Sequence, residues 1–118
     1  MASLNKILLI GNLGKDPEFK EFSNGDKIAN FSLATSDKWT DKVSQEKKEL
    51  TQWHRVVVKN KNIVRTIENF VKKGSAVVVE GKLTYRKFTA SDGLEKMSTE
   101  IVIGCLLYTS DAADDLGR

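Results

Sequence analysis

Three large flat rings in this sequence, those of Trp39, Trp53 and Phe88, each lie next to a lysine or arginine or one residue away from one. An aromatic residue that only fills a core normally has apolar neighbours at the period of a strand or helix. A ring beside a cation instead suits a platform on which the bases of a nucleic-acid strand stack. The alternative is that each ring anchors the end of a strand. Three such rings in strand-like segments favour the stacking interpretation.

Basic residues near the rings are candidate contacts for the phosphates of such a strand. They are Arg55, Lys59, Arg86 and Lys87, which share strand-like segments with the rings, and Lys38, Lys42, Lys47 and Lys48 in the charged segment 37–48. Neutralised phosphates release counterions, so binding would weaken as salt rises. Duplex DNA would bind poorly, because paired bases cannot offer their faces to the rings. For any single lysine, an ordinary solvated position is the alternative.

The composition also favours an anionic partner. The chain has 118 residues, enough for one domain, and a net charge of +3. The whole chain has 16 acids and 19 bases, of which residues 105–118 hold three acids and one base. The first 104 residues therefore hold 13 acids and 18 bases. A moderately basic body suits a polyanion. Ordinary surface charge that maintains solubility is the alternative.

Several classes of protein are excluded or made improbable by composition. No apolar run approaches the ~20 residues of a membrane span, and the apolar stretch near the N-terminus is too short for a signal peptide, so we expect a cytoplasmic protein without a membrane partner. One cysteine, Cys105, and one histidine, His54, exclude an internal disulfide and a metal site built from several such ligands. We expect no cofactor. A hydrolase that uses His54 with a carboxylate is an alternative, but no nucleophile and base stand at a recognisable spacing.

The rings must be positioned by strands, and five are predicted: 4–13, 27–38, 49–59, 75–88 and 94–103. The first is expected to be buried, and Asn24-Gly25 indicates a hairpin before the second. Residues 37–48 are predicted to form an exposed, mobile loop. A helix is expected from a cap at Asn60 or Asn62 to about Lys73, with Gly74 following it. The apolar stripe of that helix comprises Ile63, Ile67, Phe70 and Val71.

The order of three strands, one helix and two strands predicts an all-β domain with one helix over residues 1–104. Short strands that must hide their edges favour a small closed barrel. This is the order of the five-stranded OB-fold, in which the helix closes one end of the barrel and an exposed face binds oligonucleotides. The last two strands would form an unusually long hairpin.

Eight segments of the sequence carry a resemblance to a known family: 4–7, 11–17, 33–36, 53–57, 73–75, 80–83, 86–88 and 98–100. In this order they resemble bacterial single-stranded DNA-binding proteins of the homotetrameric type. The resemblance implies an OB-fold protomer, a homotetramer and single-stranded DNA wrapped around it. The implied function is sequence-independent binding and protection of single strands in replication, recombination and repair, at the nucleoid. An OB-fold module that binds RNA or acts in replication restart is the alternative.

The resemblance also implies roles for individual residues. Trp39 and Trp53 match the two stacking tryptophans of the family, and Phe88 matches a third aromatic position, commonly tryptophan. His54 matches a residue at a subunit interface. Lys59 departs from the pattern, because the family usually has a stacking aromatic residue there.

The second departure is the segment 105–118, which matches neither the last barrel strand nor the flexible tail of the family. In the family, the acidic tip of that tail recruits replication and repair proteins. We interpret 105–118 as an atypical tail of foreign origin, disordered beyond about Tyr108, so that this recruitment is lost. A divergent native terminus is the alternative.

Overall fold

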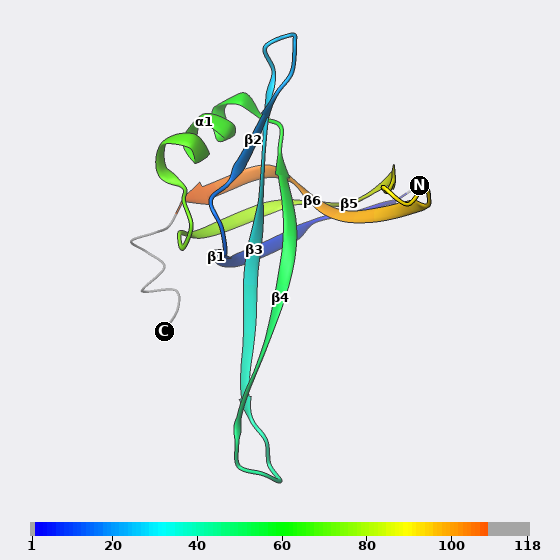
Figure 1. Ribbon diagram of the computed structural model, residues 1–118. Coiled ribbons are helices and arrows are strands. Elements are labelled where there is room, and N and C mark those ends of the chain that lie inside the picture. Colours follow the sequence, from blue (N-terminus) through cyan, green and yellow to red (C-terminus); the bar gives the residue numbers. More distant parts are fainter. Residues whose placement is uncertain (1, 109–118) are drawn as a thin grey trace.

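Six strands and one helix make up the part of the chain that the computed structural model describes, residues 2–108 (Figure 1). Only the backbone is described for residues 105–108. The elements are β1 (Ile7–Leu13), β2 (Glu18–Glu21), β3 (Lys27–Thr40), β4 (Lys47–Val58), α1 (Lys61–Phe70), β5 (Ala76–Thr89) and β6 (Glu95–Tyr108).

Five of these strands close into a barrel in the order β1-β5-β6-β4-β3, and β3 pairs again with β1. The pairing of β4 with β6 is parallel, with Val56 opposite Ile101, and the other pairings are antiparallel. This confirms the predicted all-β OB-fold with one helix. The hairpin signal at Asn24-Gly25 also holds, since the short strand β2 pairs with β3 beside this turn and Gly25 has a φ of +92°.

The core follows the period of two that a half-buried strand dictates. Fully buried side chains alternate along β3, β4 and β5, and the largest of them in strands are Leu33, Val56, Val58, Val77 and Val79. Each contributes about 1.5–3 kcal/mol by leaving water. The residues between them point outward, so the same alternation that builds the core also sets which side chains face a ligand.

The helix α1 covers one end of the barrel and buries Val64 and Ile67 in the core (Figure 1). Of the two predicted caps, Asn60 is the one used: its Oδ1 accepts hydrogen bonds from the backbone N–H groups of Asn62 at 2.9 Å and Ile63 at 3.2 Å. Within the described residues, no helix is long and apolar enough to cross a membrane.

The end of α1 differs from the prediction. The helix stops at Phe70, because Val71 adopts an extended conformation and its N–H donates to the Ile67 carbonyl. Gly74 has a φ of +89° but lies in the turn before β5, where its N–H donates to the Leu13 carbonyl. Phe70 is exposed rather than part of the buried stripe. The helix therefore ends at Phe70, three residues before the predicted end at about Lys73. The residues that follow form the turn that contacts the end of β1 and leads into β5.

The first strand is shorter and less buried than predicted. It begins at Ile7, and Leu8 and Ile10 are 64% and 48% exposed. A barrel strand has only one face toward the core, so consecutive apolar residues cannot all be buried in one chain. At Gly11 the strand β1, still paired with β5, comes close to β3, and a Cβ there would collide with the backbone carbonyl of Ala34.

The segment 37–48 was expected to be a loop, and this is wrong for most of it. Strands β3 and β4 continue as a two-stranded ribbon until Thr40 pairs with Lys47, which leaves only 41–46 outside the strands. Both faces of this ribbon are solvated, so it lacks the apolar alternation by which a strand is recognised in sequence. Three hairpins project from the barrel, formed by β2–β3, β3–β4 and β5–β6 (Figure 1).

The last strand is longer than predicted. The β6 backbone continues past Ile103 to Tyr108, which pairs with Val77, and its register against β5 shifts between Glu80 and Gly81. The prediction of disorder beyond Tyr108 falls on residues 109–118, which lie outside the described residues. The origin of the segment 105–118 stays a prediction.

Candidate nucleic-acid interface

Two predicted rings and two predicted arginines belong to one surface that spans β4, β6 and β5. On β4, Trp53 and Arg55 alternate with the inward-facing Val56 and the half-buried His54. On β5, Arg86 and Phe88 alternate with side chains of the other face, and they lie opposite residues of β6. A side chain of β6 contacts the arginines of both β4 and β5.

That side chain is the carboxylate of Glu100, which sequence reasoning missed. Its Oε2 accepts from Arg86 Nη2 at 3.0 Å and Arg86 Nε at 3.2 Å, and Arg55 Nε lies 3.2 Å away. Ser98 Oγ donates to the same oxygen at 3.2 Å. The Glu100 side chain is 6% exposed, whereas those of Arg55 and Arg86 are 52% and 54% exposed. One buried carboxylate therefore holds two arginines whose outer sides remain open to solvent.

The electrostatics of this cluster keep Glu100 ionised. The hydrogen bonds from Arg86 lower the pKa of Glu100 below its ordinary value; burial opposes this, and Ser98 and the charge of Arg55 add to it. The same contact raises the pKa of Arg86. Two guanidinium groups against one carboxylate leave one net positive charge on the surface. Fixed guanidinium groups are well suited to phosphate oxygens.

Phe88 lies beside this cluster on β5. The Arg86 Cζ atom is 5.9 Å from the centroid of the Phe88 ring, which is partly exposed. The guanidinium group thus lies between the ring and Glu100. A base stacked on Phe88 would have a cation next to it.

The indole of Trp53 is exposed, and two residues beside it are small. It is 60% exposed and lies opposite Ala34, and Gly14 lies against the edge of its indole. A Cβ on Gly14 would be 2.5 Å from Cζ3 and 2.6 Å from Cη2 of Trp53. Lys15 and Ser32 line the hollow beside the ring together with Gly14. The sequence indicates a turn at Gly14. It does not predict the contact with Trp53, because the two residues are far apart in the chain.

Trp39 lies apart from this surface. On β3 it is five residues beyond Ala34, the partner of Trp53, so the two tryptophans belong to opposite faces of the β3–β4 ribbon. It pairs with Lys48 and is half-exposed. The strong twist of a two-stranded ribbon turns its faces progressively. A single strand that touches both tryptophans has to follow that twist around the ribbon.

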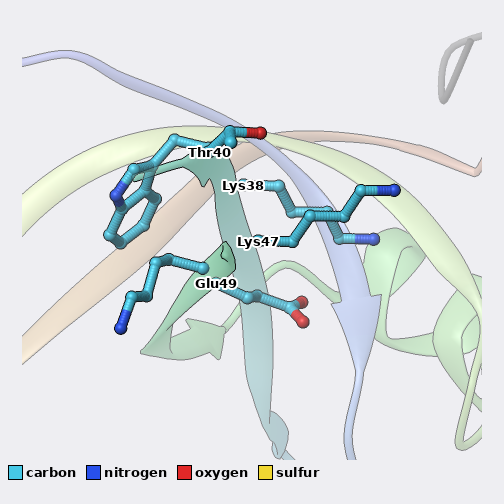
Figure 2. A pocket seen from close by; sticks show the side chains of 6 residues that line it. Lys38, Thr40, Lys47 and Glu49 are labelled. Carbon is cyan, nitrogen blue, oxygen red and sulfur yellow. The ribbon is translucent and has the colours of Figure 1, made fainter. Parts of the chain in front are cut away.

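The predicted lysines of the ribbon divide between its faces. Lys38 opposite Glu49 and Lys47 opposite Thr40 share one face, and Figure 2 shows the two lysine side chains extending in the same direction. Lys48 is on the face of Trp39 and lies 3.5 Å from Glu46. Lys42 is in the turn, where its carbonyl accepts from Gln45. Segment 37–49 holds four lysines and four acids, so its net charge is zero.

Two other predicted phosphate contacts, Lys87 and Lys59, lie apart from the cluster of Arg55 and Arg86. Lys87 faces away from Phe88 and pairs with Met97 on the opposite face of the β5–β6 hairpin. Lys59 is exposed in the link between β4 and α1. Tyr85 shares the face of Lys87 and is exposed.

His54 lies on the inward side of β4 and is half-buried. Its Nε2 is 2.8 Å from Thr35 Oγ1, a hydroxyl rather than a carboxylate. The predicted role at a subunit interface stays a prediction. In the described part of the chain, no three His, Cys, Asp or Glu side chains form a group that could hold a metal ion.

Comparison with known proteins gives consistent matches. Residues 4–107 match the Single-strand binding protein family. The "Single-stranded DNA-binding protein" of Rickettsia felis is 48% identical over 102 residues, which cover 86% of this chain and 67% of that protein, and the protein of the same name from Rickettsia prowazekii matches equally. A solved structure described as "Plasmodium falciparum SSB complex with ssDNA" superposes with a TM-score of 0.82 at 42% identity, over 92% of this chain and 97% of that one.

Proposed function

Because this chain belongs to the single-strand binding protein family, we propose that it binds and protects single-stranded DNA, without regard to base sequence, in replication, recombination and repair. The observation that supports the proposed mechanism is the surface that carries Trp53 and Phe88 together with two arginines held by the buried carboxylate of Glu100.

Binding on this surface combines stacking with charge. Bases stack on Trp53 and Phe88, each worth ~1–3 kcal/mol, and this does not select a base because every base has a flat face. Arg55 and Arg86 contact phosphates with the N–H groups that Glu100 does not use. Glu100 fixes both side chains before DNA arrives, so less side-chain entropy is lost on binding. The activity is equilibrium binding without a chemical step.

The β3–β4 ribbon adds a second contact region. Trp39 stacks a further base, and Lys38, Lys42, Lys47 and Lys48 are proposed to contact phosphates. Since the ribbon has no net charge, we assign it a smaller electrostatic share than the arginine cluster. Lys59 and Lys87 contribute long-range attraction or contacts to a strand that has wrapped around the barrel.

We also propose that the protein assembles as a homotetramer. Leu8 and Ile10 point outward from β1, and such exposed apolar side chains gathered on one strand suit a subunit contact. His54 is proposed to lie near another contact. The proposed place of action is the cytoplasm, at the nucleoid. Residues 109–118 lie outside the described part, so recruitment of replication and repair proteins is left out of the proposal.

A fluorescence titration with oligo-dT at two salt concentrations tests the function. Stacking on Trp39 and Trp53 should quench the tryptophan emission, and affinity should fall as salt rises. Oligo-U of the same length and a DNA duplex are the comparisons, and both should bind more weakly. Equal or tighter binding of oligo-U would favour an RNA-binding module, and no quenching with confirmed binding would refute the stacking mechanism.

A further inference from the structure

The hairpin between β2 and β3 carries a second ring–cation pair like the one on β5. Lys20 Nζ lies 5.6 Å from the centroid of the Phe22 ring, and Arg86 Cζ lies 5.9 Å from that of Phe88. In each pair the cation precedes the ring by two residues at the end of a strand that leads into a hairpin turn. The arrangement proposed to hold a base and a phosphate on β5 therefore recurs on another hairpin.

The Phe22 ring is exposed, and the backbone of this residue is held by the hairpin turn. The residue is 40% exposed, and it lies outside the core cluster of the described residues. Its backbone closes the Asn24-Gly25 turn: the Phe22 N–H donates to the Asp26 carbonyl at 2.8 Å, and its own carbonyl accepts from Gly25 N–H at 2.9 Å. The turn thus fixes the backbone of a residue whose ring remains partly open to a partner.

Strand register places this pair on the same face of the sheet as Trp53. Lys20 pairs with Ile28, which is six residues before Ala34 on β3, and Ala34 pairs with Trp53. An even spacing along a strand keeps side chains on one face. Phe22 lies just beyond the end of β2, and the approach of Lys20 Nζ to its ring places the ring on the side of Lys20.

Two shallow hollows connect Trp53 to the β2 strand. The first, beside Trp53, is lined by Gly14, Lys15 and Ser32. The second is also lined by Lys15 and Ser32, and it reaches Arg55 and Glu18. Because the hollows share two lining residues, they are adjacent on the surface. The second ends at Glu18 on β2, two residues before Lys20 of the ring–cation pair.

The charges along the hollows are mixed. Lys15 and Arg55 are cationic and line the second hollow, and Lys20 lies beyond it on β2. The Asp16 carboxylate, which also lines the second hollow, accepts the backbone N–H of Lys73 at 2.8 Å. Both Asp16 and Glu18 oppose an anionic strand, and neutralisation of the exposed Glu18 should strengthen binding.

We infer that the DNA strand continues from Trp53 past Lys15 onto the β2–β3 hairpin, where a base stacks on Phe22 and a phosphate contacts Lys20. The inference rests on the proposed function and extends its site. In Figure 1 this hairpin and the β3–β4 ribbon project at opposite ends of β3. A DNA strand that runs along β3 and follows the twist of the ribbon therefore meets a stacking ring near both ends.

Substitutions at Phe22 test this with a matched control in the same hairpin. Phe22→Ala and Phe22→Leu should each weaken binding of a long oligo-dT about fivefold or more, since neither residue stacks, and Phe22→Trp should bind at least as tightly as the unsubstituted protein. Phe19 is equally exposed, at 40%, but pairs with Ala29 on the other face. Phe19→Ala should therefore leave the affinity within about twofold, and we expect Glu18→Gln to raise it.

Lys20→Ala provides an independent readout. It should lower the slope of log affinity against log salt by ~0.7, the value for one phosphate contact on a single strand. Thermal unfolding of each variant identifies loss of fold. If the unsubstituted protein binds tightly while Phe22→Ala and Phe19→Ala behave alike, the inference is wrong and the proposed function stands. If the unsubstituted protein does not bind oligo-dT, the proposed function itself fails. A change in sedimentation without a change in DNA affinity would reassign Phe22 to a protein contact.

Discussion

Gly14 leaves the space that the indole of Trp53 occupies: a Cβ on Gly14 would lie 2.5 Å from Trp53 Cζ3. Real Cβ atoms do not approach other atoms this closely, so any other residue would push the ring aside. The position of a proposed stacking platform on β4 thus depends on the absence of a side chain in the turn after β1.

Gly14→Ala should therefore weaken DNA binding without touching DNA itself. We expect about a tenfold loss of oligo-dT affinity, because the displaced indole loses most of a stacking contact worth ~1–3 kcal/mol. The tryptophan emission of the free protein should also change. Gly104→Ala is the matched control, since a Cβ there meets nothing within 4 Å. Equal affinities of the two variants would show that the contact with Gly14 does not position Trp53.

Glu100→Gln should destabilise the protein in a manner that depends on pH. The pKa of Glu100 is lowered in the folded state, so its ionic contacts stabilise the fold above its ordinary value of 4.5 and are lost as pH falls through the lower folded value. At pH 7 we expect the variant to lose roughly 1–2 kcal/mol of unfolding free energy, limited by the exposure of both arginines.

Urea unfolding of both proteins between pH 7 and pH 3 measures this difference. It should shrink steadily below about pH 4.5, as the carboxyl group of the unsubstituted protein becomes protonated. A difference that stays constant down to pH 3 would mean that the charge of Glu100 is not what stabilises the cluster.

Phe88→Trp should be tolerated and should tighten binding by up to about fivefold, because the larger ring offers more stacking area. Arg86 next to the ring can form the same cation–π contact with an indole. Phe88→Leu keeps an apolar side chain of similar reach and should weaken binding about fivefold or more. The measurement is equilibrium titration with fluorescently labelled oligo-dT. Tighter binding by the leucine variant would remove Phe88 from the stacking surface.

How far the site could be predicted depends on how local its signals are. The rings and their cations are neighbours in sequence, so Trp53 with Arg55 and Arg86 with Phe88 could be identified from spacing alone. Glu100 could not, because its partners come from two other strands and only the barrel brings them together. The Phe22 pair was missed for a different reason: its β2 strand is four residues long and exposed throughout, so it lacks the alternation that marks a strand.

The fold shows the same division. The order of elements along the chain followed largely from apolar alternation, which one buried face imposes on a barrel strand. The β3–β4 ribbon beyond the barrel has no such constraint, and its pairing of Trp39 with Lys48 is set by backbone hydrogen bonds that leave no trace in composition. The outward-facing Leu8 and Ile10 were mistaken for core residues because apolar side chains that serve a second surface look the same in sequence.

Leu8→Glu should dissociate the proposed homotetramer while leaving the barrel folded. Leu8 pairs with Glu80 on β5, whose carboxylate already lies 2.7 Å from Lys6 Nζ, so a second carboxylate there adds negative charge to a surface proposed to be apolar in the assembly. A charge left unpaired in an interface costs several kcal/mol. Val43→Glu is the control, since Val43 is equally apolar but lies in the turn of the β3–β4 ribbon. Sedimentation velocity at micromolar concentration should show smaller species for Leu8→Glu only, with circular dichroism unchanged in both. Tetramers that persist with glutamate at position 8 would place the subunit contact on another face of the barrel, and Leu8 would then be an exposed apolar residue without a role in assembly.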